Sequence, residues 1–253
     1  MRKHKVISKT VNLSADQPGG LYKLGCAVAD IYLTHPWDRS INLGRPWLYV
    51  VVDACSEMIT GIHVTFGPPG HEGNLKALHI SIMDKVEFCK GLGIAITDEE
   101  WPARGLPLSV YDCDGTLRTL GDALVRNLQI EVLQGPAQPV DISKLLGNLA
   151  NPLQSRLIHW LKTADPAQDD EHANADGAST MLITSVDFVR WLDLAVLEYN
   201  NALQPLFPMS DQMIVDGVEP RPAKMWSWGI HNRTGIPRNP NAAWVNAAFS
   251  PGK

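Results

Sequence analysis

The sequence predicts an α/β fold, and three of its segments carry that prediction. Residues 47–53 form a nearly unbroken apolar run, as expected of a strand that is buried on both faces. Residues 21–33 alternate imperfectly and are rich in Val, Ile and Tyr, which also indicates a strand. Residues 74–92 place apolar side chains at helical spacing. Strands and helices interleaved in this way predict a sheet with helices packed on it.

The rest of the chain continues the interleaving. Thr184 is placed to cap the last predicted helix. The further predicted elements, in chain order, are strand 59–66, a short strand at 108–113, helix 117–128, strand 130–133, helix 143–161 with a kink or restart at Pro152, and helix 186–201. The order up to residue 161 is therefore three strands, a helix, a strand, a helix, a strand and a helix, and the helix at 186–201 follows.

Composition divides the chain into three expected regions. Residues 1–20 form a basic N-terminal arm, and residues 21–203 form the α/β core. Residues 204–253 contain seven prolines together with Trp226, Trp228 and Trp244. No long helical pattern is evident there, so we expect an extended segment packed over the body.

Bulk composition excludes several classes of protein. With 45% apolar and 19% charged residues, the chain has the composition of an ordinary globular protein. No apolar run approaches the ~20 residues that span a bilayer, and the basic N-terminus is not followed by a signal-peptide core. The four cysteines lack CxxC spacing, so we expect reduced thiols in a cytoplasm. Because no segment is apolar enough to span a bilayer, we expect no membrane partner.

Charge is distributed unevenly along the chain. The net charge is −5, yet residues 1–24 hold five Lys and Arg against one acid, and residues 220–253 hold five against none. Basic ends on an acidic middle suit phosphate contact through the ends of the chain, although they also suit plain solvated tails. We therefore expect non-specific DNA contact through these arms.

Three stretches carry a resemblance to a known family. They are PGGLYKLGCAVADIYL at residues 18–33, GRPWLYVVVDACSEMITGIHV at 44–64 and DGVEPRPAKMWSWGIHNRTG at 216–235. They resemble the TnsB-type DDE transposases, relatives of the retroviral integrases and of phage Mu transposase. The resemblance implies an RNase H-like integrase core, a mixed five-stranded sheet flanked by helices, plus the extended C-terminal segment. A β-barrel follows that segment in the family and is absent from this sequence.

The resemblance also implies a chemistry, DNA strand transfer by three carboxylates that hold two divalent metals. The matching positions here carry Gly25 on the first strand, Cys113 in the YDCDG turn, and Gly147 or Asn148 in the later helix. No glutamate occurs between Glu131 and Glu171. We therefore expect no intact catalytic residue, no metal and no cofactor. Asp53, on the second strand, matches a structural position of the family.

Two alternatives stay open. Asp112, Asp114 and Asp30 could form a relocated set that binds Mg²⁺ or Mn²⁺ and transfers strands, because a bulge at a strand end can re-aim a side chain. The chain could instead be a domesticated protein-interaction module.

The leading hypothesis is an inactive transposase-like subunit that binds DNA or a partner and acts near the nucleoid. Its expected phosphate contacts are Lys224, His231, Arg233 and Arg238, and its expected partners are DNA, other transposase subunits or further copies of itself.

Overall fold

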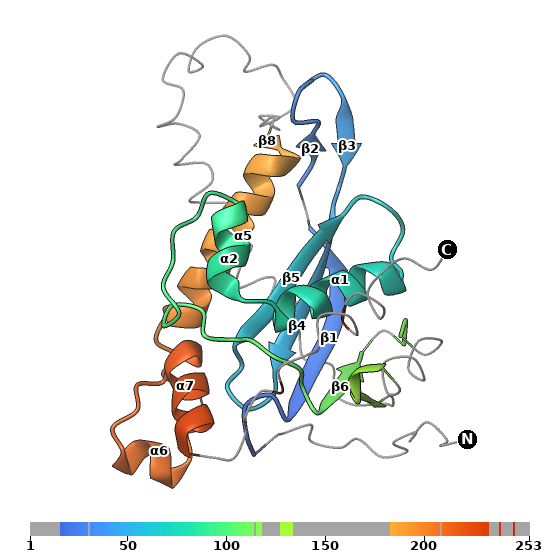
Figure 1. The fold of residues 1–253 in the computed structure, drawn as a ribbon. Coiled ribbons are helices and arrows are strands. Elements are labelled where there is room, and N and C mark those ends of the chain that lie inside the picture. The colour runs from blue at the N-terminus through green and yellow to red at the C-terminus, as the bar shows by residue number, and fades with distance from the viewer. Residues whose placement is uncertain are drawn as a thin grey trace, which may run out of the picture.

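The fold is organised around a mixed sheet of five strands with β1 at its centre (Figure 1). The computed structural model describes residues 16–29, 31–113, 115–117, 127–133, 183–207, 209–232, 238 and 245. The strands of this sheet are β1 (Leu21–Val28), β4 (Trp47–Asp53), β5 (Ile59–Thr65), β6 (Ser109–Asp112) and β7 (Glu131–Leu133). Their order is β5-β4-β1-β6-β7.

Strand direction changes at β1. The pairs β1–β4 and β4–β5 are antiparallel, whereas β1–β6 and β6–β7 are parallel. In β4 every residue after Trp47 is buried, as the apolar run predicts for a strand covered on both faces. A mixed five-stranded sheet with flanking helices is the architecture expected of an RNase H-like core, so the predicted fold class is confirmed.

A second, smaller sheet projects from one end of the core. Its strands are β2 (Leu33–Thr34), β3 (Asn42–Gly44) and β8 (Ile183–Thr184), in the order β3-β2-β8. The single strand expected over residues 21–33 is therefore wrong, because β1 ends at Val28 and β2 pairs elsewhere. The Thr34 hydroxyl donates to the Ile183 carbonyl at 3.2 Å and so joins β2 to β8, the strand that leads into the next helix.

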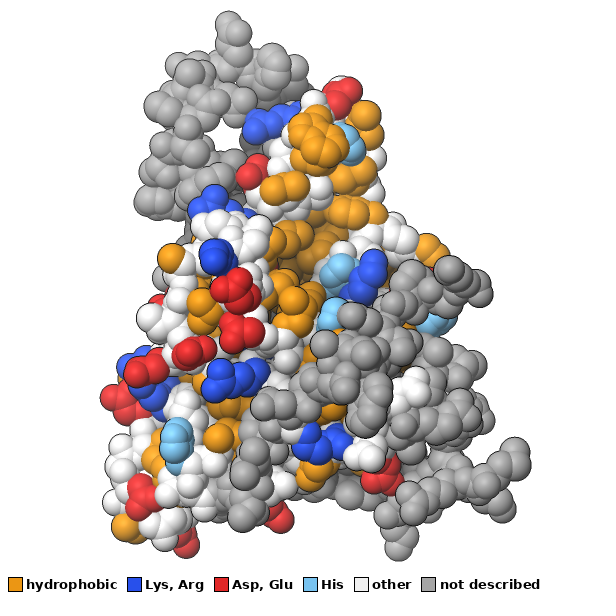
Figure 2. Space-filling model, in the orientation of Figure 1, with side chains coloured by type: hydrophobic (Ala, Val, Ile, Leu, Met, Phe, Trp, Pro, Cys, Tyr) orange, Lys and Arg blue, Asp and Glu red, His pale blue; other side chains and the backbone are white. Residues whose placement is uncertain are grey.

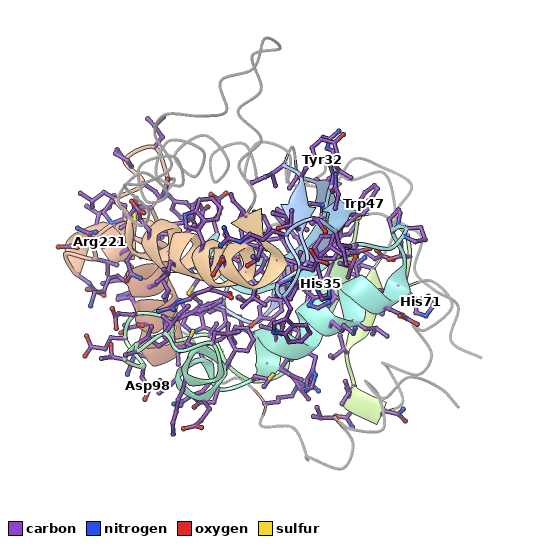
Figure 3. The ribbon with its side chains drawn as sticks, turned by 90° about the horizontal axis from the view of Figure 1, so that it is seen from above. Tyr32, His35, Trp47, His71, Asp98 and Arg221 are labelled. Atoms are coloured by element: carbon purple, nitrogen blue, oxygen red, sulfur yellow. The ribbon has the colours of Figure 1, made fainter. Side chains whose placement is uncertain are left out.

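Two long helices lie in separate layers (Figures 1 and 3). Helix α1 (His71–Ile82) packs across β5, β4 and β1. Helix α5 (Ser185–Asn201) packs on β5 and β2, and the Thr184 hydroxyl caps it by accepting from the Asp187 amide at 3.2 Å. The buried side chain of Asn200 accepts from the Ile59 amide and donates to its carbonyl, both at 2.9 Å, and so fastens the end of α5 to β5.

The predicted helix over residues 74–92 is in fact two helices. Helix α1 ends at Ile82, and α2 (Lys85–Gly91) starts afresh with Asp84, whose carboxylate accepts from the Glu87 amide at 3.0 Å. The buried Lys85 ammonium fixes the joint by donating to three backbone carbonyls, those of Ser81, Met83 and Ala103. The apolar pattern keeps the same helical phase on both sides of the break, so it does not show that the helix ends. Asp84, a residue type favoured at helix N-termini, was the signal of a new helix.

The C-terminal region also differs from the expected extended segment. It contains α6 (Asp211–Val215) and α7 (Pro222–Asn232), and α7 buries Ala223, Met225, Trp226 and Gly229. Proline in the first turn of a helix removes no hydrogen bond, so Pro222 starts α7 and does not break it. Residues 1–15, most of helix 117–128 and all of helix 143–161 lie outside the described residues.

The surface is mixed in charge. On the face shown in Figure 2, basic and acidic side chains are interspersed over the side formed by α2 and α7. Among the residues that the structure describes, no helix is long and apolar enough to cross a membrane.

Close contact between α1 and the sheet gives the first prediction. A Cβ added to Gly61 of β5 would lie 2.3 Å from the Ala77 carbonyl oxygen and 2.7 Å from the Ser81 nitrogen, both backbone atoms of α1. Gly61→Ala should therefore force α1 off the sheet and lower the free energy of unfolding by about 2–3 kcal/mol. Gly91→Ala, at the end of α2 with nothing within 4 Å, is the matched control. Urea unfolding should show the control neutral or more stable by about 0.5 kcal/mol; equal effects of both substitutions would contradict the packing.

Candidate functional site

The register of β1 and β6 places two of the three expected ligand positions side by side. Leu24 pairs with Asp112, and the Cys113 amide donates to the Leu24 carbonyl at 3.0 Å. Successive side chains along a strand point to opposite faces, and paired residues of parallel strands point to the same face. Gly25 and Cys113 therefore share one face of the sheet, and Leu24 and Asp112 share the other.

Lys23 joins Gly25 and Cys113 on their face of the sheet. It lies two residues before Gly25 on β1 and is half-buried. Burial lowers the pKa of Lys23, while the charges of Glu57, Cys113 and Asp53 act in the opposite direction. Sequence analysis missed this lysine. The two-residue period of a strand places Lys23 and Gly25 on the same face, so the signal was present.

The described residues of this face do not fit a pair of hard divalent cations. Glycine supplies no ligand, and a thiol is a soft ligand that Mg²⁺ disfavours. The Lys23 ammonium would repel a metal ion placed beside Gly25 and Cys113. Across the described residues, no group of three or more His, Cys, Asp or Glu side chains is arranged to hold a metal. Gly147, the third expected position, lies outside the described residues.

Asp112 is the one described member of the alternative carboxylate set. Its side chain is only 2% exposed, and its Oδ2 accepts from the Leu117 amide at 2.7 Å. It therefore braces the turn after β6, on the opposite face from Gly25 and Cys113. Asp30 and Asp114 lie outside the described residues, so the structure does not bring the three together.

Asp53 has an internal role at the end of β4. Its carboxylate is fully buried and accepts from the Gly19 amide at 2.9 Å, the Ser56 amide and hydroxyl at 2.8 Å each, and the Cys55 amide at 3.2 Å. Burial raises the pKa of Asp53 to about 6, although these hydrogen bonds favour the charged form. Asp53 thus ties the start of β1 to the β4–β5 turn, which is the structural role expected for it.

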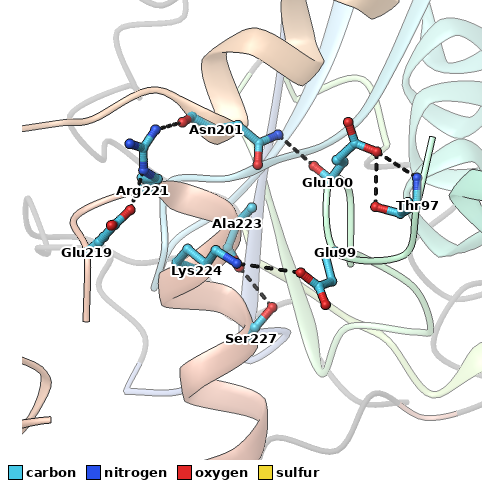
Figure 4. Close-up of polar contacts among 9 residues, drawn as sticks. All are labelled: Thr97, Glu99, Glu100, Asn201, Glu219, Arg221, Ala223, Lys224 and Ser227. Carbon is cyan, nitrogen blue, oxygen red and sulfur yellow. Dashed lines mark hydrogen bonds and ion pairs between the residues drawn. The ribbon is translucent and has the colours of Figure 1, made fainter. Parts of the chain in front are cut away.

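The expected phosphate contacts do not form one cluster. Lys224 and His231 are both exposed on α7; the Lys224 ammonium lies 3.7 Å from a Glu99 carboxylate oxygen (Figure 4), and His231 Nδ1 lies 2.6 Å from the Ser227 carbonyl oxygen. Arg238 is half-buried against the opposite edge of the sheet, where its guanidinium donates to the Pro107 and Gln129 carbonyls at 2.6 and 3.0 Å. Arg233 lies outside the described residues.

Comparison with known proteins identifies the family of this chain. The family model of the TnsB C-terminal domain matches residues 26–162, more than half of the chain. The chain belongs to this family. It is 27% identical over 247 residues to the transposition protein TnsB of transposon Tn7 from Escherichia coli, a match that covers 97% of this chain and 35% of that protein. The transposase of transposon Tn552 from Staphylococcus aureus is 26% identical over 102 residues, which is 40% of this chain and 18% of that protein. The chain thus spans about a third of TnsB and less of the Tn552 transposase.

Solved structures of integrases are more distant. The HTLV-2 integrase catalytic core domain in complex with magnesium aligns with a TM-score of 0.41 at 11% identity, covering 76% of this chain and 92% of that one. The simian T-cell lymphotropic virus intasome in complex with the PP2A regulatory subunit B56 gamma aligns with a TM-score of 0.42 at 12% identity, covering 95% and 63%. Both TM-scores are below 0.5, so the fold assignment rests on the strand order and directions above.

The position of Asp112 gives the second prediction. Asp112→Ala removes the acceptor of the buried Leu117 amide and should lower the free energy of unfolding by about 1–3 kcal/mol. Asp112→Asn keeps a carbonyl oxygen of the same shape and should cost clearly less. Chemical denaturation of both variants measures the difference. Equal losses, or a loss that appears only in the presence of Mn²⁺, would contradict the bracing role.

Proposed function

We propose that this protein acts in DNA transposition or integration as a subunit without strand-transfer activity, which holds DNA or a partner transposase. The observation that supports the proposal is the register of β1 and β6, in which Leu24 pairs with Asp112, so that the next residues, Gly25 and Cys113, lie side by side at the ends of the paired segments. In this fold, two of the three carboxylates of a DDE enzyme are expected at those positions.

The chemistry of DNA strand transfer explains why the residue types at positions 25 and 113 matter. Transfer of a DNA phosphodiester needs an activated oxygen nucleophile and a way to stabilise the leaving oxygen, and two metals about 4 Å apart do both. Gly25 and Cys113, next to the Lys23 ammonium, offer neither the negative charge nor the hard oxygen atoms that would bind two divalent metal ions. The relocated alternative gains no support from Asp112, because its carboxylate faces the other side and is bound to the Leu117 amide.

A DNA-holding role is compatible with the rest of the molecule. Lys224 and His231 are exposed on α7, where a phosphate can reach them. Arg238 is engaged with two backbone carbonyls and fits a role in anchoring the C-terminal segment. The basic ends of the sequence add cations that need no fixed geometry to bind phosphates. Such a subunit would work in the cytoplasm, at the nucleoid.

Metal binding gives the third prediction. Mn²⁺ or Mg²⁺ should leave the melting temperature of the natural chain unchanged, because a ligand stabilises a fold only when it binds the folded state. The double variant Gly25→Asp with Cys113→Asp restores two neighbouring carboxylates. Its melting temperature should rise with Mn²⁺, measured by differential scanning fluorimetry.

The paired variants also provide the control. Gly25→Asn with Cys113→Asn has similar volume without the charges, and should show no dependence on Mn²⁺. A metal-dependent rise in the natural chain, or strand transfer by it in Mn²⁺, would contradict the proposal and support the relocated carboxylate set.

DNA binding gives the fourth prediction. The chain should bind duplex DNA with an affinity that falls steeply as salt rises, and Lys224→Gln should reduce the slope of log K against log salt by about 0.9 if Lys224 contacts one phosphate. Lys90→Gln is the matched control, because Lys90 is also an exposed helical lysine 3.7 Å from a glutamate. Fluorescence anisotropy at several salt concentrations measures both. Absence of binding at low salt would favour the protein-interaction module.

A further inference from the structure

Strands β2 and β3 and the connection between them lie at one end of the molecule (Figure 1), and three large apolar side chains in or next to this hairpin are exposed. Tyr32 is 57% exposed, Trp37 is 90% exposed and Ile41 is 47% exposed. We call these three residues the hairpin patch. Exposed apolar surface gathered on one element is typical of a binding surface, and tryptophan is among the residues that contribute most to protein interfaces.

The hairpin patch is held in place by local hydrogen bonds. The His35 amide donates to the Ile41 carbonyl at 3.0 Å, and the Ile41 amide donates to the Asp38 carbonyl at 3.1 Å. The rings of His35 and Trp37 meet edge to face, with centroids 5.4 Å apart. Because the loop is already ordered, a partner that binds it loses less conformational freedom.

The surroundings of the hairpin patch are on balance basic. Residues 31–45 carry two arginines, Arg39 and Arg45, and one histidine, His35, against a single acid, Asp38. Both arginines are exposed. The Asp38 carboxylate accepts from the amide and the hydroxyl of Ser40, at 3.0 and 2.6 Å.

A second exposed apolar surface lies around α6. Leu206 is 98% exposed, Ile214 is 63% exposed and Val215 is 78% exposed; we call these three residues the α6 patch. The turn that carries Leu206 is joined to the segment after α6, because the Gln204 amide donates to the Pro220 carbonyl at 2.7 Å. This hydrogen bond closes, at its two ends, the part of the chain that carries both Leu206 and α6.

The surroundings of the α6 patch are on balance acidic. Residues 203–221 contain Asp211, Asp216 and Glu219 against one basic residue, Arg221, whose guanidinium is paired with the Glu219 carboxylate. All three acids are exposed. The charge around the α6 patch is thus opposite in sign to the charge around the hairpin patch.

The two patches lie at opposite ends of the molecule. Figure 1 shows β2 and β3 at the top and α6 at the bottom, and the view from above separates Tyr32 and His35 from Arg221, which follows α6 closely (Figure 3). A chain cannot cover one of its patches with the other, but a second copy can. We propose that the hairpin patch of one copy docks against the α6 patch of the next, in a head-to-tail interface.

The alternative partner for the hairpin patch is DNA, through stacking of Trp37. The number of exposed apolar side chains favours a protein. Stacking on a base needs one ring such as that of Trp37, whereas the same hairpin also exposes Tyr32 and Ile41. DNA would also leave the acid-rimmed α6 patch uncovered. A head-to-tail contact covers both patches, and by its geometry continues to a ring or a filament.

The test begins with the mass of the full chain, measured by sedimentation velocity as protein concentration rises. The natural chain should associate beyond a monomer. Trp37→Ala and Ile214→Asp, one in each patch, should each weaken association by about tenfold or more. Leu194→Ala is the matched control, because Leu194 is 46% exposed on α5 and belongs to neither patch. Circular dichroism should show all three variants folded, since every substituted side chain is exposed.

Mixing the variants distinguishes head-to-tail association from a symmetric contact. The Trp37→Ala chain keeps an intact α6 patch, and the Ile214→Asp chain keeps an intact hairpin patch. An equimolar mixture should therefore form a complex that stops at two chains, whereas each variant alone stays monomeric.

Three results would overturn the proposal. One is a natural chain that stays monomeric at every concentration. Another is a mixture that fails to assemble although the natural chain does. The last is a Trp37→Ala variant that loses affinity for DNA while its association is unchanged, which would assign the hairpin patch to nucleic acid.

Discussion

The parallel pairing of β1 with β6 is the constraint on which the functional interpretation depends. Its register sets Leu24 against Asp112, and strand alternation then fixes which side chains share a face with Gly25 and Cys113. A shift of one residue would exchange the two faces and bring the Asp112 carboxylate to the Gly25 side. Backbone hydrogen bonds from the Ser109 amide to the Gly20 carbonyl and from the Cys113 amide to the Leu24 carbonyl hold this register, and the Asp112 carboxylate braces the turn that follows β6.

Two buried ionisable groups of the described core, Asp53 and Lys85, have structural roles. The Asp53 carboxylate accepts hydrogen bonds from Gly19, Cys55 and Ser56, and so joins the start of β1 to the turn between β4 and β5. Lys85 satisfies three carbonyls at the α1–α2 joint, where burial lowers its pKa to about 7. Carboxylates that catalyse through metals must instead converge on a shared, accessible point. Asp53 and Asp112, the described aspartates at the ends of β4 and β6, are each bonded to nearby backbone.

The sequence predicts the core well and its joints poorly. Residues 47–53 and 186–201 were identified correctly because apolar runs and helical spacing report burial directly. The split between α1 and α2 was missed because the apolar pattern continues unchanged across the helix break at Asp84. Helix α7 was missed because prolines suggest extended chain, whereas Pro222 starts a helix. The adjacency of Gly25 and Cys113 is a long-range feature that spacing along the chain cannot supply; it followed from family resemblance and is seen in the strand register.

The proposed absence of metal ligands is compatible with a stable fold, because the core of this sheet is apolar and Asp53 and Asp112 at the strand ends are hydrogen-bonded within the chain. Anomalous diffraction from a crystal soaked in Mn²⁺ tests most directly whether this protein binds metal ions at the ends of β1 and β6. We predict no manganese peak beside Gly25 and Cys113. Two peaks about 4 Å apart at the ends of β1 and β6 would show a working metal site and contradict the loss of catalysis.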